Sequence, residues 1–274
     1  MSQVTDQHSL KHEQYGDASN LNARIALHQR FGTAQKDWQR WVFDQFALPP
    51  NARILEVGCG PGRLWVQNLD RLPAGWEVTL SDFSPGMVAQ ARQNLAASDH
   101  PFAFGQFDAQ AIPFAGASFD AVIANHMLYH VPDRRKTYAE VRRVLKPGGL
   151  FYAAANSRDT MRQITELEAH AGVVGGVKDF HSSADFFLEN GEAELAAWFP
   201  RVTLRRQEEA LLVTEAQPLI DYILSVVDGL EIAAGTLDRL RDMVEAGIRE
   251  QGAFRIDKIS GLLIAENGSF RRAL

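Results

Sequence analysis

The apolar positions of the chain alternate between short continuous runs and stretches with helical spacing. Arg53–Val57, Ser118–Asn125 and Leu150–Ala155 are short apolar runs, which predict buried strands. Arg63–Leu72 instead carries apolar residues three and four positions apart, which predicts a helix. Strands that alternate with helices are typical of an α/β fold.

The carboxyl-terminal third of the chain continues this pattern. Arg201–Val213 and Phe254–Ala265 predict strands, and Pro218–Val227 and Thr236–Gln251 predict the helices between them. We expect the last two strands to pair antiparallel. The result is a Rossmann-like, seven-stranded mixed sheet with its last strand antiparallel and helices on both faces.

Regions at both ends of the central core add helices to this plan. Tyr15–Phe31 and Thr33–Ala47 show helical spacing, and residues 157–198 hold more helical sequence than a connecting loop needs. We therefore divide the chain into an N-terminal helical lid (1–48), a nucleotide-binding core (49–156), a helical cap (157–198) and strands and helices that complete the core (199–274). The cap would line an apolar acceptor pocket with Met161, Ile164, Phe180, His181 and Phe186.

Three alternate glycines follow the first predicted strand. The segment Ile54–Gly62 reads I-L-E-V-G-C-G-P-G, so Gly58, Gly60 and Gly62 lie on the turn from strand to helix. Glycine suits such a turn because the backbone angles are unusual and because a Cβ would collide with a ligand lying across the loop. The loop therefore predicts a binding site for an adenosine ligand.

The loop departs from the dinucleotide fingerprint G-x-G-x-x-G. That fingerprint requires a glycine at position 63, where this chain has Arg63, and an acidic residue, Glu56, precedes the first glycine. The third glycine of the fingerprint serves pyrophosphate binding through close helix packing. A ligand without a pyrophosphate therefore fits this loop better than a dinucleotide does.

Further blocks follow at characteristic intervals. Trp76–Phe83 predicts a strand that ends in Asp82, about twenty residues beyond the glycines, where an acid commonly binds ribose hydroxyls. The blocks Phe104–Phe114, Ser118–Asn125 and Val141–Gly149 come next. With these blocks, residues 50–156 resemble the class I S-adenosylmethionine-dependent methyltransferases, particularly the small-molecule branch that includes the ubiquinone and menaquinone biosynthesis enzymes.

The resemblance implies a cofactor, S-adenosylmethionine, with S-adenosylhomocysteine as its product. It implies that Asp82 binds the ribose, that Asp108 and the Ala109 backbone bind the adenine, and that Asn125 and His126 lie beside the methionine moiety. The predicted cofactor-binding set is Glu56, Gly58, Gly60, Gly62, Asp82, Phe83, Met87, Asp108, Ala109, Asn125, His126 and Arg24.

The chemistry asks for alignment more than for acid–base groups. S-adenosylmethionine is an activated donor, so methyl transfer is an in-line displacement that needs orientation and exclusion of water. A base helps when the acceptor is a hydroxyl or a protonated amine. His126 and His130 are the nearest candidates, although His130 also fits a positioning role. By analogy with the lids of related enzymes, Tyr15, Arg24 and His28 face the methionine end or the acceptor, while Arg24 and His28 equally fit a surface role.

Composition bounds the remaining possibilities. The 274 residues are 46% hydrophobic, with a formal net charge of −6 and a single cysteine. An acidic chain opposes nucleic-acid binding, since polyanion binding needs a basic face. The sequence contains no apolar run near the roughly 18 residues that span a bilayer, no signal-peptide pattern and no metal-ligand spacing. We expect a cytoplasmic monomer or homodimer with a small-molecule acceptor, without membrane insertion or a metal.

The sequence thus predicts methyl transfer to a small apolar or aromatic metabolite, with oxygen or nitrogen favoured over carbon as the receiving atom. Three alternatives stay open. A nucleotide-dependent oxidoreductase is disfavoured by Arg63, and an RNA methyltransferase by the net charge. The third is a protein that binds S-adenosylmethionine without transferring its methyl group.

Overall fold

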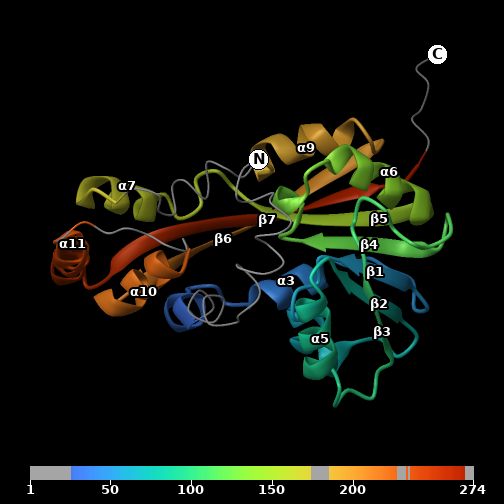
Figure 1. Cartoon of the computed structure of the whole chain (residues 1–274), viewed down its shortest axis with the longest axis horizontal. Helices are drawn as coiled ribbons and strands as arrows, with labels where there is room; N and C mark the ends of the chain where they lie inside the picture. Colours follow the sequence, from blue (N-terminus) through green and yellow to red (C-terminus); the bar gives the residue numbers. More distant parts are fainter. Residues whose placement is uncertain (1–25, 174–184, 227–232, 234, 269–274) are drawn as a thin grey trace. The chain divides into compact units, whose positions relative to one another are not determined.

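The computed structural model describes residues 26–173, 185–226, 233 and 235–268, which fall into two compact units (Figure 1). Unit 1 is drawn from Met1–Gln35, Ser157–Asp185 and Gln207–Ser260, and unit 2 from Lys36–Asn156, Phe186–Arg206 and Gly261–Leu274. Each unit combines parts of several of the four segments predicted from the sequence.

Seven strands form one mixed sheet in the order β3-β2-β1-β4-β5-β7-β6. The strands β1 to β5 pair in parallel, whereas β5 with β7 and β7 with β6 pair antiparallel. The predicted mixed sheet is confirmed. The strands are β1 (Arg53–Val57), β2 (Glu77–Asp82), β3 (Phe102–Gln106), β4 (Phe119–Asn125), β5 (Leu145–Asn156), β6 (Arg201–Val213) and β7 (Phe254–Glu266).

Helices cover both faces of the parallel strands, as predicted. The chain steps from β1 to β2 to β3 in one direction across the sheet and from β4 to β5 in the other. Right-handed crossovers therefore put α5 and α6 on opposite faces (Figure 1). The named helices are α3 (Trp38–Asp44), α4 (Arg63–Val66), η3 (Leu69–Arg71), α5 (Pro85–Asn94), η4 (Leu128–His130), α6 (Arg134–Val144), α7 (Arg162–Ala171), α9 (Leu188–Ala196), α10 (Ala216–Val226) and α11 (Thr236–Gln251).

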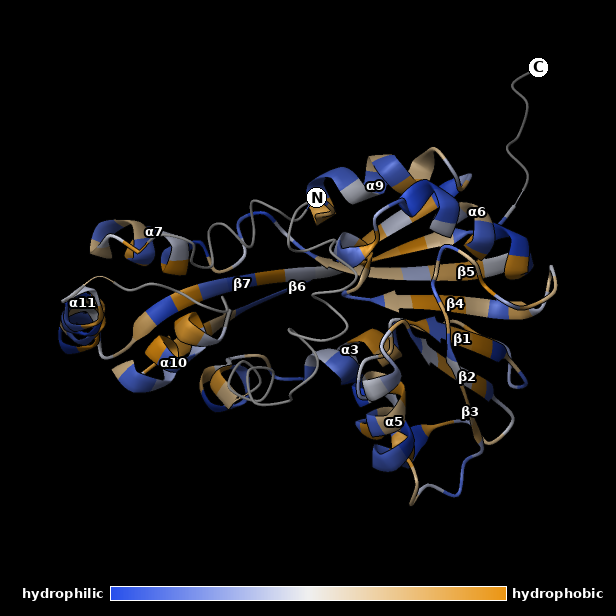
Figure 2. Ribbon diagram, viewed as in Figure 1, coloured by the Kyte–Doolittle hydropathy of each residue, from blue (hydrophilic) through white to orange (hydrophobic). Residues whose placement is uncertain are grey.

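The core of unit 2 is built on its parallel strands. Ile54 of β1, Leu80 of β2 and Ile123 of β4 are buried in one apolar cluster together with Trp65 and Val42. Parallel strands are covered on both faces, so their sequences form nearly continuous apolar runs, which Figure 2 shows along β4. This burial explains why these strands were recognisable in the sequence.

The core of unit 1 contains residues that we had expected to line an acceptor pocket. Met161 and Ile164 pack with Phe31, Leu240 and Ile256, and both are almost fully buried. In unit 2, Phe186 is also buried. These side chains form cores instead of lining an open pocket, because apolar residues at helical spacing serve either purpose equally well. Phe180 and His181 lie outside the described residues.

Two of the element boundaries that differ from the sequence prediction have a visible structural cause. The helix predicted over 63–72 is split into α4 and η3, because the buried Asn68 donates its side-chain amide to the Leu64 carbonyl (2.6 Å) and so ends the first helix. The fifth strand begins at Leu145, which pairs with Phe119, and not at Leu150. An irregular register follows that first pair, and periodicity does not reveal such a feature.

Candidate functional site

The site predicted from the sequence lies at one edge of the sheet in unit 2. Parallel register aligns Val57 with Ser81, Asp82 with Gln106 and Glu56 with Ile123. The carboxyl ends of β1, β2, β3 and β4 therefore meet at the same edge, which is where open α/β sheets bind ligands. The glycine loop, Asp82 and the residues that follow β3 and β4 are brought together there.

All three glycines of the loop adopt left-handed backbone conformations. The φ angles of Gly58, Gly60 and Gly62 are +67°, +53° and +76°. A Cβ on Gly58 would lie 2.7 Å from the side chain of Met127, whereas a Cβ on Gly60 would meet nothing within 4 Å. Gly58 thus packs against the segment after β4, and Gly60 presents bare backbone to open space. This cradle fits a ligand that lies directly on the main chain.

Asp82 links the end of β2 to the glycine loop. One oxygen accepts from the Gly60 amide (2.9 Å), and the other accepts from the Ser84 amide (2.8 Å). Burial raises the pKa of this carboxyl, while the amides of Ser84, Gly60 and Phe83 oppose the rise. A carboxylate has about four lone-pair sites, so Asp82 can also accept from ligand hydroxyls. Its position is fixed before any ligand arrives.

Glu56 is buried beneath this loop, with only 2% of its surface exposed. Burial raises the pKa of its carboxyl to about 8, and the nearby Asp82 charge adds to the rise. The Trp65 indole opposes it by donating to Glu56 Oε2 (2.7 Å). Burial and the charges of Glu56 and Asp82 also raise the pKa of the Cys59 thiol. The loop therefore rests on an acidic cluster that favours protonation or a nearby cation.

The residues after β3 form a second wall of the site. Both carboxylate oxygens of Asp108 accept from the Gln110 side-chain amide (3.1 and 2.9 Å), and one also accepts from the Gln110 backbone amide (2.9 Å). The following residue, Ala109, is buried. The Phe107 amide donates to the Asp82 carbonyl (3.3 Å). Gln110, which sequence reasoning missed, thus orients the carboxylate predicted to bind adenine.

The end of β4 is contacted by the first turn of α3. Asn125 Oδ1 accepts from the Trp38 indole (3.1 Å), and its Nδ2 donates to Gln39 Oε1 (2.8 Å). The rings of Trp38 and His126 lie 5.0 Å apart. The helical spacing of Thr33–Ala47 predicts a core position for Trp38, which does pack against the apolar cluster of unit 2, but it gives no indication of the contact made by Gln39. A half-buried tryptophan needs a partner for its N–H, and this need was the available signal.

The remaining predicted residues have varied positions. Met87 is buried in the first turn of α5, four residues after Phe83 in the sequence. His130 ends η4, and its ring packs edge-on against Tyr129 at 4.5 Å. His28 is in unit 1, where its ring faces Tyr222 at 6.0 Å. Tyr15 and Arg24 lie outside the described residues.

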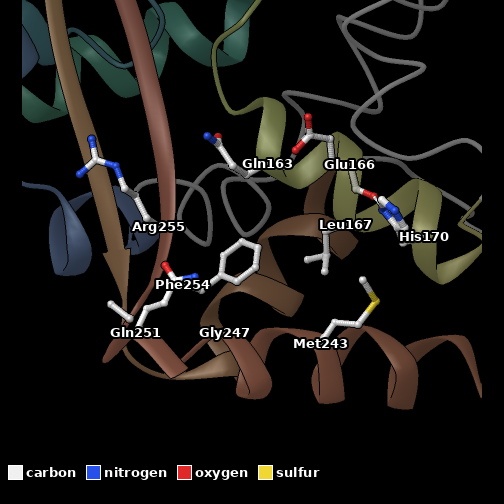
Figure 3. Close-up of a pocket in the computed structure, with 10 residues that line it drawn as sticks. Gln163, Glu166, Leu167, His170, Met243, Gly247, Gln251, Phe254 and Arg255 are labelled. Atoms are coloured by element: carbon white, nitrogen blue, oxygen red, sulfur yellow. Dashed lines mark hydrogen bonds between the residues drawn. The ribbon is translucent and has the colours of Figure 1, made fainter. Parts of the chain in front are cut away.

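Unit 1 contains a separate hollow of about 390 Å³. The Phe254 ring and the Met243 and Leu167 side chains lie around it, with polar groups from α7 nearby (Figure 3). None of its lining residues is one that the sequence assigned to the cofactor. The residues that line this hollow are Gln163, Glu166, Leu167, His170, Met243, Gly247, Gln251, Ala253, Phe254 and Arg255.

The ranges that the structure describes contain no metal-ligand cluster and no membrane-spanning helix. No group of three or more His, Cys, Asp or Glu residues there is arranged to hold a metal ion. No helix in the same ranges combines the length and apolar character needed to cross a membrane.

Comparison with known sequences identifies the region that forms this site. The family model described as "Methyltransferase domain" matches residues 55–153. A ubiquinone/menaquinone biosynthesis C-methyltransferase of Geotalea daltonii is 35% identical over 42% of this chain and 49% of the relative. A malonyl-[acyl-carrier protein] O-methyltransferase of Enterobacter lignolyticus is 36% identical over 42% of this chain and 43% of the relative. The chain spans about half the length of such curated relatives.

Solved structures share the fold at low sequence identity. A Haemonchus contortus phosphoethanolamine N-methyltransferase, solved with phosphomonomethylethanolamine and S-adenosylhomocysteine, has a TM-score of 0.58 and 17% identity over 97% of this chain and 60% of its own. The [4+2]-cyclase SpnF has a TM-score of 0.56 and 16% identity over 91% of this chain and 93% of its own. The same architecture therefore serves more than one chemistry.

Proposed function

We propose that this protein transfers the methyl group of S-adenosylmethionine to a small-molecule acceptor, because its residues 55–153 match the family model described as "Methyltransferase domain". One observation carries the proposal. The open backbone at Gly60, the fixed carboxylate of Asp82 and the wall after β3 converge at one sheet edge. A nucleoside needs contacts of these three kinds.

The residues present fit the cofactor, which is S-adenosylmethionine. The bare main chain of the glycine loop would receive it, Asp82 would accept from its ribose hydroxyls, and Asp108 and Ala109 would hold its adenine. Asn125 and His126 would lie at its methionine end. The acidic cluster of Glu56 and Asp82 beneath the loop suits a ligand with a positive charge.

The protein groups have few chemical duties in this proposal. When bound, the cofactor supplies a sulfonium-activated methyl group, so the chain needs to align the acceptor with that carbon and to exclude water. His126 would accept a proton from a hydroxyl or ammonium acceptor, and a carbon acceptor that is already nucleophilic would not need it. His130, which ends η4, would position the segment after β4.

We further propose oxygen or nitrogen of a small apolar or aromatic metabolite as the receiving atom. The two relatives above are named for carbon and for oxygen, and the Haemonchus enzyme for nitrogen. The product's carbon chemical shift identifies the atom directly. A methyl carbon bonded to oxygen would support this choice, as would one bonded to nitrogen, and a methyl bonded to carbon would overturn it.

Two measurements test the main proposal. Calorimetry should detect binding of S-adenosylhomocysteine, with NAD as the negative control. Methyl-labelled S-adenosylmethionine incubated with the protein and a metabolite extract should then transfer label to a small molecule. No binding would refute the cofactor assignment. Binding without label transfer would favour the second candidate function, a protein that binds S-adenosylmethionine without transferring its methyl group. The fold shared with a [4+2]-cyclase is the observation that favours this candidate.

The organisation around the core is also proposed. Residues 1–48 would act as a lid and 157–198 as a cap, and the protein would be a cytoplasmic monomer or homodimer. Proteolysis that slows at both segments when S-adenosylhomocysteine is added would support the lid and cap. Light scattering gives the oligomeric state, and cell fractionation gives the location.

A further inference from the structure

The first turn of α3 satisfies both polar ends of the Asn125 side chain. The Trp38 indole donates to Asn125 Oδ1 (3.1 Å), and Gln39 Oε1 accepts from Asn125 Nδ2 (2.8 Å). An amide with both ends bonded cannot flip without breaking two hydrogen bonds. The orientation of Asn125, the last residue of β4, is therefore set by another element of unit 2.

The same turn supports His126, the next residue. His126 has a φ of +56°, a left-handed conformation that is uncommon for a residue with a side chain. Its amide donates to the Ala154 carbonyl (3.3 Å), and its ring lies 5.0 Å from the Trp38 ring. Such a conformation persists only where surrounding contacts hold it, and it is common at functional sites.

The turn itself is firmly anchored. Asp37 caps α3 by accepting from the Gln39 amide (2.9 Å), and Asn68 donates to the Gln39 carbonyl (3.1 Å). The Trp38 ring also stacks on Trp41 at 5.2 Å. Gln39 is thus fixed at its backbone N–H, its carbonyl and its side chain, so the turn is a rigid support.

We propose that Trp38 and Gln39 are positioning residues for methyl transfer, which hold the Asn125 amide and the His126 imidazole at the methionine end of the cofactor. This inference rests on the proposed function. Loss of either contact would let the tip of β4 move. Rates of in-line displacement depend steeply on alignment, so turnover would fall more than cofactor affinity.

Conservative substitutions test this role. Trp38→Phe keeps an aromatic ring and removes the N–H donor, while Gln39→Leu removes the acceptor for Asn125 Nδ2. The matched control is Trp76→Phe. Trp76 belongs to the same apolar cluster, and its indole donates to the Pro49 carbonyl (3.0 Å), away from Asn125. Each tryptophan variant therefore loses one indole hydrogen bond. Only the bond lost in Trp38→Phe involves β4.

We expect Trp38→Phe and Gln39→Leu to lower label transfer about 2- to 10-fold, the scale of one hydrogen bond, and to leave S-adenosylhomocysteine affinity within about 2-fold. Trp76→Phe should match the wild type in both. The Asn125 side-chain amide resonances, which need no cofactor, should shift in the first two variants and not in the control.

The outcomes separate the two proposals. A wild-type protein that does not bind S-adenosylhomocysteine refutes the proposed function itself. A wild type that binds and transfers label, with Trp38→Phe indistinguishable from Trp76→Phe, overturns the positioning role alone. If Trp38→Phe does not fold, Gln39→Leu decides: normal turnover or unchanged Asn125 resonances would contradict the inference.

Discussion

The substitution Glu56→Gln should make the stability of the protein less sensitive to pH. The carboxyl of Glu56 is buried, and its pKa lies near 8 in the fold against an ordinary value of 4.5. Between these values the unfolded chain has released the proton that the folded chain keeps. Folding therefore takes up a proton, and the contribution of Glu56 to the free energy of unfolding falls as pH rises from 4.5 to 8.

The magnitude follows from the shift. A rise from 4.5 to about 8 is about 3.5 pH units, and at about 1.4 kcal/mol per unit the full effect is on the order of 5 kcal/mol. Glutamine has nearly the same shape, keeps an oxygen acceptor for the Trp65 indole and does not titrate. The variant should therefore gain on the wild type by about 1.4 kcal/mol for each pH unit within this window.

Urea unfolding of both proteins from pH 5.5 to 7.5 measures the difference. Glu77→Gln is the control, because Glu77 is exposed and pairs with Arg53 at the surface end of β2. We expect the gap between Glu56→Gln and wild type to widen by about 3 kcal/mol over these two pH units, and the Glu77→Gln curve to run parallel to wild type. A Glu56→Gln curve that also runs parallel would show that Glu56 is ionised in the fold, and the argument from burial would fail.

Three further predictions concern the cofactor site. Binding of S-adenosylmethionine should release more protons near pH 7 than binding of S-adenosylhomocysteine, because its sulfonium charge favours ionisation of the Glu56 carboxyl. Calorimetry in buffers of different ionisation enthalpy measures the protons released. Equal release with both ligands, unchanged in Glu56→Gln, would contradict this prediction. Asp82→Ala should weaken S-adenosylhomocysteine binding by about 1 to 3 kcal/mol, because a charged acceptor is lost; an unchanged affinity would remove Asp82 from the site. His126→Ala should lower turnover more than cofactor affinity, and a normal rate would exclude it as a base.

The sequence predicted those elements whose local residue pattern has a single physical explanation. β1 has the bounds we expected, because a buried parallel strand is a short apolar run with turn formers after it. The three glycines of the loop adopt positive φ angles, which other residues rarely adopt. The aspartate at the end of β2 contacts that loop because parallel register fixes where strand ends lie.

Other features depend on contacts between residues far apart in the chain, which no local pattern encodes. The bonds from Trp38 and Gln39 to Asn125 join positions more than 80 residues apart. The predicted long helix after the glycine loop is interrupted because one asparagine, Asn68, bonds back to it. An apolar residue such as Met161 can line a pocket or pack in a core, and its neighbours in the fold decide which. In this protein Met161 is a core residue.

The double engagement of Asp82 limits how this protein can be redesigned. Nucleoside preference in such sites is usually attributed to the acid at the tip of the second strand, which makes position 82 the obvious target for accepting an altered cofactor. Here the same carboxylate closes the glycine loop through Gly60. Exchanging Asp82 would therefore disturb the glycine loop together with the ribose contact that we propose for this acid, so a redesign for synthetic cofactors should leave position 82 unchanged.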